Sequence, residues 1–209
     1  MIKMNEKVND ILRYLDELYP NPKCELLFDK DYELLIAVVL SAQCTDKRVN
    51  TVTRVLFEKY KTIYELDNAP LSEISNIIKP CGTFNKKSVY IKEICHSLIK
   101  DYSGLVPNNR KYLETLPGVG RKTTNVVLGI LYNEPAIAVD THVARLSKRL
   151  GLSKNTDDVT IIEKKLMRKI PKDKWIRFHY QMVLFGRYRC KSKSPMCEEC
   201  KLKKYCRKK

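Results

Sequence analysis

The chain has 209 residues, with 40 Lys or Arg against 24 Asp or Glu, so its formal net charge at pH 7 is +16. A hydrophobic content of 44%, with only 7 Gly and 9 Pro, excludes a disordered or collagen-like chain. The excess of positive charge predicts a polyanionic partner and favours nucleic-acid binding over a merely solvated basic surface.

The first residues and the apolar segments predict a cytoplasmic protein with no membrane partner. The N-terminus Met1–Glu6 has neither the apolar core nor the small-residue cleavage site of a secretion signal. The longest apolar run, Leu34–Leu40, is much shorter than the roughly 18–20 residues that a membrane-spanning helix needs. In a reducing cytoplasm we expect the eight cysteines to stay reduced, which favours metal binding where they cluster.

Apolar residues recur with helical spacing along nearly the whole chain, and no long stretch alternates apolar and polar residues. Asp157 and Asp173 stand at two expected helix starts, and prolines and glycines follow several segments. The pattern therefore predicts an all-α protein. The segments expected to be helical are Val8–Leu18, Val49–Leu56, Ser72–Ile78, Lys86–Asp101, Arg110–Thr115, Arg121–Tyr132, His142–Leu150, Asp157–Ile170 and Asp173–Phe185.

The segment Leu116–Leu128 predicts a helix, a glycine hairpin and a second helix. Pro117 and Gly118 end the first helix, and Gly120 allows a tight turn before helical spacing resumes. Backbone N–H groups at such a helix start form an anion site suited to a DNA phosphate, without reading sequence. A plain turn between two helices is the alternative. The hairpin residues expected to contact DNA are Gly118, Val119, Gly120 and Arg121.

Lys122 stands in the first turn of the second helix. There the positive end of the helix dipole and the neighbouring Arg121 both disfavour a protonated amine. A neutral lysine amine is the form that acts as a nucleophile, so Lys122 is a candidate catalytic residue. Its alternative role is contact with phosphate.

The segment Ala136–His142 brings Asp140 to the start of the next helix. Asp is among the best N-cap residues, and one carboxylate oxygen can cap the helix while the other faces a ligand. Asp140 is therefore predicted to cap and is also a candidate catalytic carboxylate. His142 lies on the same turn, where a structural role is favoured over that of a base.

Four cysteines near the C-terminus have the spacing C-x6-C-x2-C-x5-C, which supplies enough thiolates for a tetrahedral zinc ion or a four-iron cluster. Cys190–Lys209 carries eight Lys or Arg against two Glu, and this short polar segment is expected to depend on a metal for its order. The other cysteines are predicted to be small core side chains. The first set is Cys190, Cys197, Cys200 and Cys206, and the second is Cys24, Cys44, Cys81 and Cys95.

Three motifs together resemble the endonuclease III family, bifunctional DNA glycosylases and abasic-site lyases of the helix-hairpin-helix superfamily. They are L-P-G-V-G-R-K-T at 116–123, V-D-T-H at 139–142 and G-R-Y-x-C-x6-C-x2-C-x5-C at 186–206. The apolar segment 34–43 also looks like the family's helix before the lesion site. The resemblance implies a six-helix domain over 24–134 with the hairpin. It also implies a helical domain of 1–23 plus 135–209 with a [4Fe-4S] cluster loop at 190–206.

The resemblance also implies roles for individual residues. Lys122 would be the nucleophile, Asp140 the essential carboxylate, and Gln43 the residue that fills the gap left by an extruded nucleotide. The four C-terminal cysteines would bind the cluster. Where many members carry a bulky apolar wedge, this chain has Thr83, followed by Phe84. Between the first two cluster cysteines, Lys191 and Lys193 are expected to contact phosphate.

The implied activity is removal of oxidised pyrimidines from double-stranded DNA through a lysine Schiff base, with strand cleavage by β-elimination, by a monomer associated with the nucleoid. One alternative is a monofunctional adenine or mismatch glycosylase, which uses an Asp and an activated water; Lys122 argues against it. The other is a non-enzymatic DNA-binding protein whose hairpin and basic tail only hold phosphate, which predicts no need for Asp140.

Overall fold

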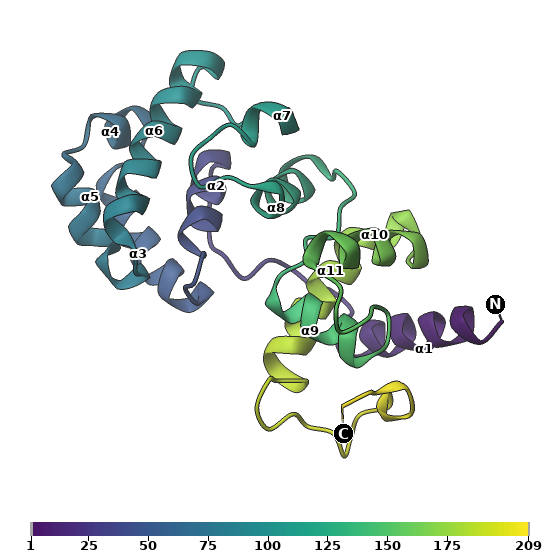
Figure 1. Ribbon diagram of the computed structural model, residues 1–209. Coiled ribbons are helices and arrows are strands. Elements are labelled where there is room, and N and C mark those ends of the chain that lie inside the picture. The colour runs from purple at the N-terminus through teal and green to yellow at the C-terminus, as the bar shows by residue number, and fades with distance from the viewer. Residues whose placement is uncertain (1, 209) are drawn as a thin grey trace. The chain divides into compact units, whose positions relative to one another are not determined.

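The computed structural model describes residues 2–208, and every regular element in that part of the chain is a helix (Figure 1). The prediction of an all-α protein is therefore confirmed. Among the described residues, no helix is long and apolar enough to cross a membrane. The chain divides into two compact units, which are described separately. The central unit is Glu25–Tyr132, and the terminal unit combines the residues before and after it, against expected boundaries at 24 and 134.

The central unit contains seven α-helical segments instead of the expected six. The additional segment is the short α4, whose six residues lay outside every predicted helix. In chain order the segments are α2 (Asp31–Leu40), α3 (Asp46–Lys59), α4 (Ile63–Asn68), α5 (Leu71–Ile78), α6 (Phe84–Tyr102), α7 (Arg110–Leu113) and α8 (Arg121–Tyr132), with a 3₁₀ turn at Lys79–Cys81.

Helix α2 forms the core of the central unit. All of its residues from Tyr32 to Leu40 are buried, and it packs against α3, α6 and α8 (Figure 1). This burial on every side explains why its sequence is a continuous apolar run without a polar face, since a helix that is hydrophobic all round must be covered all round.

The terminal unit is built from both ends of the chain. Side chains of α1 such as Ile11 and Leu15 share one apolar core with Leu146 and Phe178, which lie more than 100 positions later. The elements are α1 (Ile2–Leu18), α9 (Thr141–Arg149), α10 (Val159–Lys169) and α11 (Trp175–Leu184), with 3₁₀ turns at Lys172–Lys174 and Lys203–Tyr205 and a π-helical turn at Phe185–Arg189.

Two predicted helix starts in the terminal unit are wrong. Helix α10 starts after Asp158, whose side chain accepts a hydrogen bond from the Ile161 N–H at 2.8 Å. Asp157, the predicted start, instead accepts hydrogen bonds from the Lys154 N–H and the Lys165 ammonium, each at 2.6 Å. Helix α11 starts at Trp175, because the residues around Asp173 form a 3₁₀ turn.

The cysteine segment is anchored to the terminal unit by ordinary side-chain contacts. Leu202 is 1% exposed and belongs to the apolar core, and the Tyr205 hydroxyl donates to Asp10 Oδ2 at 2.7 Å. Lys204 also pairs with Asp10 at 2.7 Å, and these two partners lower the pKa of Asp10 to about 2. The prediction that this segment depends on a metal, and not on apolar burial, for its order is therefore incomplete, because α1 and the core hold one end of it.

The four scattered cysteines divide into two pairs. Cys81 and Cys95 are buried as predicted, and burial raises the pKa of each thiol to about 12. Cys24 and Cys44 are only partly buried, so the prediction that they are core side chains is wrong.

Candidate active site

The hairpin between α7 and α8 rests on the central unit's core through Gly118. Its φ is 74°, in the left-handed region that favours glycine. A β carbon there would lie 2.7 Å from Tyr90 Cδ2 and 3.3 Å from Val39 Cγ1, so any side chain would push the turn off α6 and α2. Val119 is 3% exposed. Its side chain therefore serves packing, and any DNA contact at Val119 must come from its backbone.

The outer edge of the hairpin starts α8. The Gly120 carbonyl accepts the first helical hydrogen bond from the Thr124 N–H at 3.0 Å. Gly120, Arg121 and Lys122 are all exposed. The structure thus places the predicted nucleophile Lys122 on the surface, in the first turn of α8, two residues beyond the hairpin glycine.

Gln43 and Thr83 both lie at left-handed turns of the backbone. Their φ values are 56° and 44°, although neither is glycine, and both side chains are exposed. Such a conformation costs about 1–3 kcal/mol and persists only where the surroundings enforce it. These strained turns follow α2 and precede α6, respectively, while Phe84 is partly buried at the start of α6.

Lys87 of α6 is the group that fixes both turns, and sequence analysis missed it. Its ammonium donates to the carbonyls of Leu40, Ala42 and Cys81 at 3.0, 2.8 and 2.9 Å. Ala42 directly precedes Gln43, and Cys81 lies two residues before Thr83. Lys87 is 4% exposed, and burial lowers its pKa. The sequence offered one signal of this burial: Lys87 stands four residues before Ile91, so both lie on the same face of α6, which is buried.

Replacing Lys87 by Met is expected to destabilise the protein by about 2–4 kcal/mol, because unsatisfied buried carbonyls cost about 1–3 kcal/mol each and the costs are not additive. Urea unfolding measures this change. Lys86→Met, at the exposed neighbouring lysine, is the matched control and is expected to stay within about 0.5 kcal/mol of the parent. Equal stability of the two variants would contradict the structural role of Lys87.

Asp140 is the N-cap of α9 in the terminal unit. Its Oδ1 accepts a hydrogen bond from the Val143 N–H at 2.8 Å, so the predicted cap is confirmed. The preceding residues Ile137–Val139 are buried, and Asp140 itself is half-buried. The cap uses one carboxylate oxygen, which leaves Oδ2 uncommitted to the helix.

His142 is held by the residues around it. Arg145 Nη2 lies 3.2 Å from His142 Nδ1 and also donates to the Gly186 carbonyl at 2.8 Å. Burial lowers the pKa of His142, and the positive charges of Arg145 and Arg187 lower it further against the opposing effect of Asp140. A neutral, fixed imidazole fits the structural role that the sequence favours.

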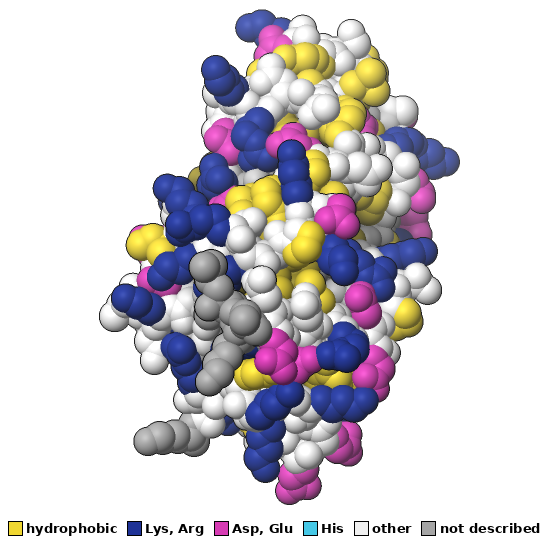
Figure 2. All heavy atoms as spheres, turned by 90° about the vertical axis from the view of Figure 1, so that its right-hand side faces the viewer, with side chains coloured by type: hydrophobic (Ala, Val, Ile, Leu, Met, Phe, Trp, Pro, Cys, Tyr) yellow, Lys and Arg dark blue, Asp and Glu magenta, His cyan; other side chains and the backbone are white. Residues whose placement is uncertain are grey.

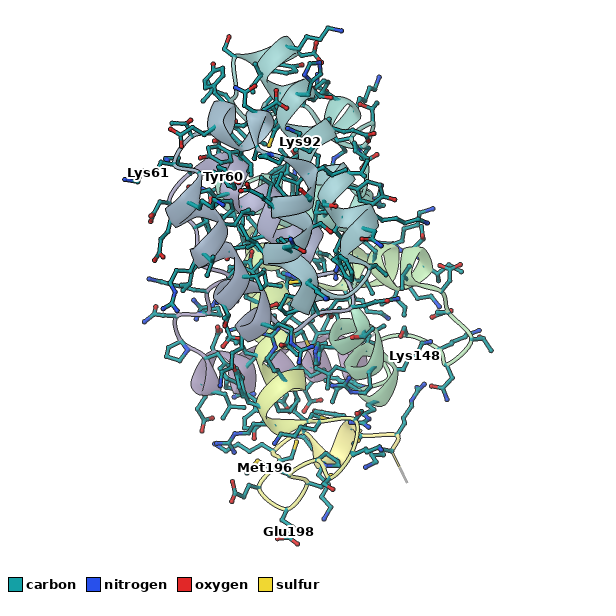
Figure 3. All side chains as sticks on the ribbon, turned by 90° about the vertical axis from the view of Figure 1, so that its left-hand side faces the viewer. Tyr60, Lys61, Lys92, Lys148, Met196 and Glu198 are labelled. Carbon is teal, nitrogen blue, oxygen red and sulfur yellow. The ribbon has the colours of Figure 1, made fainter. Side chains whose placement is uncertain are left out.

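Arg149 of α9 holds the start of the cysteine segment. Its guanidinium donates to Cys190 Sγ at 3.3 Å and to the carbonyls of Lys191 and Ser192 at 2.7 and 3.1 Å. The side chains of Lys191 and Lys193 are exposed. Farther along the segment, Met196 and Glu198 lie at its outer end (Figure 3).

Cys200 lies within electrostatic reach of the other three C-terminal cysteines. Burial is the main cause that raises the pKa of Cys200, and the other three thiols also raise it, while the Leu202 N–H lowers it. Across residues 2–208, no three Cys, His, Asp or Glu side chains converge as ligands of a single ion. Four free thiols on one loop, with N–H donors at Cys190 and Cys200, match the donor set of an iron–sulfur cluster.

The predicted site residues are divided between the units. Gln43, Thr83, the hairpin and Lys122 belong to the central unit. Asp140, Lys191, Lys193 and the four cysteines belong to the terminal unit.

Sequence comparison relates nearly the whole chain to proteins of known activity. Residues 36–172 match the HhH-GPD family, described as the HhH-GPD superfamily base excision DNA repair protein. The chain is 46% identical over 202 residues to Endonuclease III of Bacillus subtilis (strain 168), covering 97% of this chain and 92% of that relative. It is 44% identical to Endonuclease III of Rickettsia prowazekii (strain Madrid E), over 95% and 93% of the two chains.

Solved structures give the same relationship. A trapped Endonuclease III–DNA covalent intermediate, the estranged-adenine complex, matches with a TM-score of 0.93 and 47% identity, covering 97% of this chain and 95% of that chain. A thermostable thymine-DNA glycosylase matches with a TM-score of 0.84 and 27% identity over 97% and 96%. Both the backbone fold and the sequence therefore correspond over almost the entire chain.

Proposed function

Because the chain belongs to the HhH-GPD superfamily of base excision DNA repair proteins, and within it to the endonuclease III family, we propose how its residues act on DNA. The protein is an enzyme, a DNA glycosylase with lyase activity. We propose that it removes oxidised pyrimidines from double-stranded DNA through Lys122. The observation that carries the proposal is the position of Lys122, exposed in the first turn of α8 directly after the hairpin.

We propose that the positive charge of the protein and the backbone N–H groups of its hairpin make the first contacts with DNA. Lys and Arg side chains are spread over the face in Figure 2, with acidic side chains between them, as the net charge of +16 requires. The hairpin from Gly118 to Arg121 supplies N–H groups at a helix start for a backbone phosphate. We propose that the protein acts as a monomer in the cytoplasm, where this charge holds it on nucleoid DNA.

A damaged pyrimidine must leave the base stack before its sugar can be attacked, at a cost of a few kcal/mol that is smallest for a damaged, weakly stacked base. Gln43 supports the extruded state, because its left-handed turn presents it from the end of α2 toward solvent. Thr83 occupies the equivalent exposed turn before α6, and it offers less apolar surface than a bulky wedge. Phe84 is partly buried, which favours a packing role.

The reaction then proceeds on the extruded nucleotide. Neutral Lys122 Nζ bonds to C1′, the glycosidic bond breaks, and the base leaves with the bonding electrons and takes up a proton. Asp140 accepts the lysine proton and stabilises the positive charge that develops on the sugar. Ring opening gives a Schiff base, loss of a C2′ proton expels the 3′ phosphate by β-elimination, and water releases Lys122.

Borohydride reduction tests the proposal, because it converts a Schiff base into a stable covalent link. Duplexes with thymine glycol or an abasic site are expected to trap the protein, and an undamaged duplex is not. If base release occurred with no trapped species, the protein would be a monofunctional glycosylase, and the proposed role of Lys122 would be wrong.

The endonuclease III family implies an iron–sulfur cluster, and the donor set fits one. We propose that Cys190, Cys197, Cys200 and Cys206 hold a [4Fe-4S] cluster. When bound, such a cluster would cross-link the loop and supply one-electron redox chemistry. Two residues position the cysteine loop: Arg149 donates to Cys190 Sγ, and Leu202 packs in the apolar core. Purified protein with a visible absorption band supports iron, and a colourless protein that binds zinc contradicts it.

We propose that Lys191 and Lys193 contact DNA phosphates. The protein backbone at Lys191 is held in place by Arg149. Replacing both lysines by Ala is expected to reduce the slope of log affinity against log salt by roughly 1.8, since each phosphate contact contributes about 0.9. Titrations of duplex DNA between low and moderate salt measure the slope. Lys203→Ala, at an exposed lysine beyond Cys200, is the control. An unchanged slope in the double variant would remove the idea.

A further inference from the structure

The terminal unit contains a basic pocket at the junction of α9 and α10. Its volume is about 420 Å³, and no acidic side chain lines it. Its cationic lining residues, five in all, are Lys154, Lys165, Arg168, Lys169 and Arg207. The basic pocket lies within one unit, and none of the residues assigned above to catalysis, to DNA contact or to the cluster lines it.

Two cationic groups converge at the edge of the basic pocket, over Gly151. A β carbon on Gly151 would lie 2.7 Å from Arg207 Nε and 2.8 Å from Lys7 Nζ, so both charged groups approach the same point. The position of Arg207 is fixed by its backbone N–H, which donates to the Arg149 carbonyl at 2.7 Å. Like charges are therefore held together by the fold.

Within the described residues, only one of the pocket's cations has an acidic partner. Lys165 pairs with Asp157 at 2.6 Å. Lys7, Lys169 and Arg207 have no carboxylate within ion-pair distance in the part of the chain that the structure describes. Burial lowers the pKa of Lys7, and repulsion from Arg207 and Lys169 lowers it further.

The end of α9 does not account for this charge, although cations favour a helix C-terminus. Its last carbonyls already accept backbone hydrogen bonds. Ser147 accepts from Leu152 at 2.8 Å, and Lys148 accepts from Gly151 at 3.1 Å. The converging cations are therefore not needed to satisfy the helix end.

Ser153, which also lines the basic pocket, adds a polar group without a partner. The residue is 5% exposed, and its Oγ has no hydrogen-bond partner among the described residues. Buried hydroxyls are nearly always hydrogen-bonded, and an exception calls for an unseen ligand or water. The Ser153 Oγ itself has almost no exposed surface, so the cations of the basic pocket, and not this hydroxyl, are the groups that meet a phosphate oxygen.

We propose that the basic pocket binds a chain of phosphoryl groups, of the kind present in inorganic polyphosphate. The volume exceeds the roughly 30 Å³ that one water occupies in the liquid by more than tenfold, so a single small ion would leave it mostly empty. The lining has no aromatic side chain on which a base could stack. Phosphates joined by one bridging oxygen also match converging cations better than DNA phosphates, which a sugar separates.

Calorimetric titration of the full-length protein with sodium tripolyphosphate, at constant ionic strength, tests the proposal. We expect saturable binding of one ligand per chain and a thermal midpoint that rises with ligand concentration. Lys169→Gln with Arg207→Gln is expected to weaken binding by about 10-fold or more, because two charged hydrogen-bond donors are lost. Removing like-charge repulsion is expected to leave the midpoint without ligand no lower than that of the parent.

The matched control is Lys164→Gln with Lys203→Gln, which removes the same charge from exposed positions outside the pocket. We expect its affinity for tripolyphosphate within about 2-fold of the parent, since distant exposed charges are screened by salt. Ser153→Ala is expected to fold normally and to bind tripolyphosphate within about 2-fold of the parent, because its Oγ is covered. Absence of saturable binding, or equal losses in both double variants, would overturn the proposal.

A second arm identifies the source of the phosphate. We expect Lys169→Gln with Arg207→Gln to leave affinity for an abasic-site duplex equal to that of the control double variant. If duplex binding instead fell by the same factor as tripolyphosphate binding, the basic pocket would be a DNA contact, and the proposal of a free polyphosphate ligand would be wrong.

Discussion

Replacing Lys122 by Ala is expected to slow strand cleavage at an abasic site on the order of 10³-fold or more, because the covalent route disappears with its nucleophile. Borohydride is expected to trap none of the variant. Duplex binding is expected to persist, with a salt slope reduced by at most about 0.9, the contribution of one phosphate contact. Gel analysis of trapped complexes and a salt titration measure the two effects separately.

Lys122→Arg separates the nucleophile from a mere phosphate contact. Arginine keeps the positive charge, yet it stays protonated and cannot form the imine. It is expected to bind DNA like the parent and to remain inactive. Lys100→Ala, at an exposed lysine near the end of α6, is the control that should trap normally. Trapping of the Lys122→Ala protein would show that another amine carries out the reaction.

Replacing Asp140 by Asn is expected to lower turnover by about 10²–10³-fold, the loss typical when an electrostatic stabiliser of the transition state is removed. Asparagine caps a helix about as well as aspartate, so the hydrogen bond to the Val143 N–H is expected to remain. The thermal midpoint of the Asn variant should therefore match that of the parent. Single-turnover base release and thermal unfolding together give the result.

Asp140→Ala supplies the second comparison for this residue. It removes both the charge and the cap, so it is expected to lose about 1 kcal/mol of stability in addition to its activity. An active Asn variant beside an unstable Ala variant would mean that Asp140 only caps α9. An inactive but stable Asn variant supports the role of the carboxylate in the reaction.

The parts of the fold that local chemistry determines could be predicted from sequence. The start of α8 follows from the glycine turn before it, and the Asp140 cap follows from the preference of Asp for that position. Lys87 could not be placed in the same way, because its partners come from Leu40, Ala42 and Cys81. Nothing in the local sequence distinguishes Lys87 from an exposed lysine. It becomes buried and bonds to these carbonyls only because α6 packs on α2.

The same limit applies to the cysteine segment and to the basic pocket. Leu202 and Tyr205 dock on a core that includes α1, and the bonded residues Asp10 and Tyr205 are 195 positions apart in the sequence. Lys7 and Arg207 likewise meet over Gly151 although they stand at opposite ends of the sequence. Hydrophobic spacing and turn residues describe neighbours along the chain, and they carry no information about such encounters.

Because the terminal unit contains both ends of the chain, the two units must fold in a set order during translation. The residues of the central unit are continuous, so they can fold as soon as they leave the ribosome. Helix α1 emerges first but must wait for Phe178 and finally Leu202 before its apolar side is covered. The core that supports Asp140 is therefore complete only when translation is nearly finished. A prematurely truncated product is expected to fold the central unit with its hairpin and to lack an ordered terminal unit around Asp140.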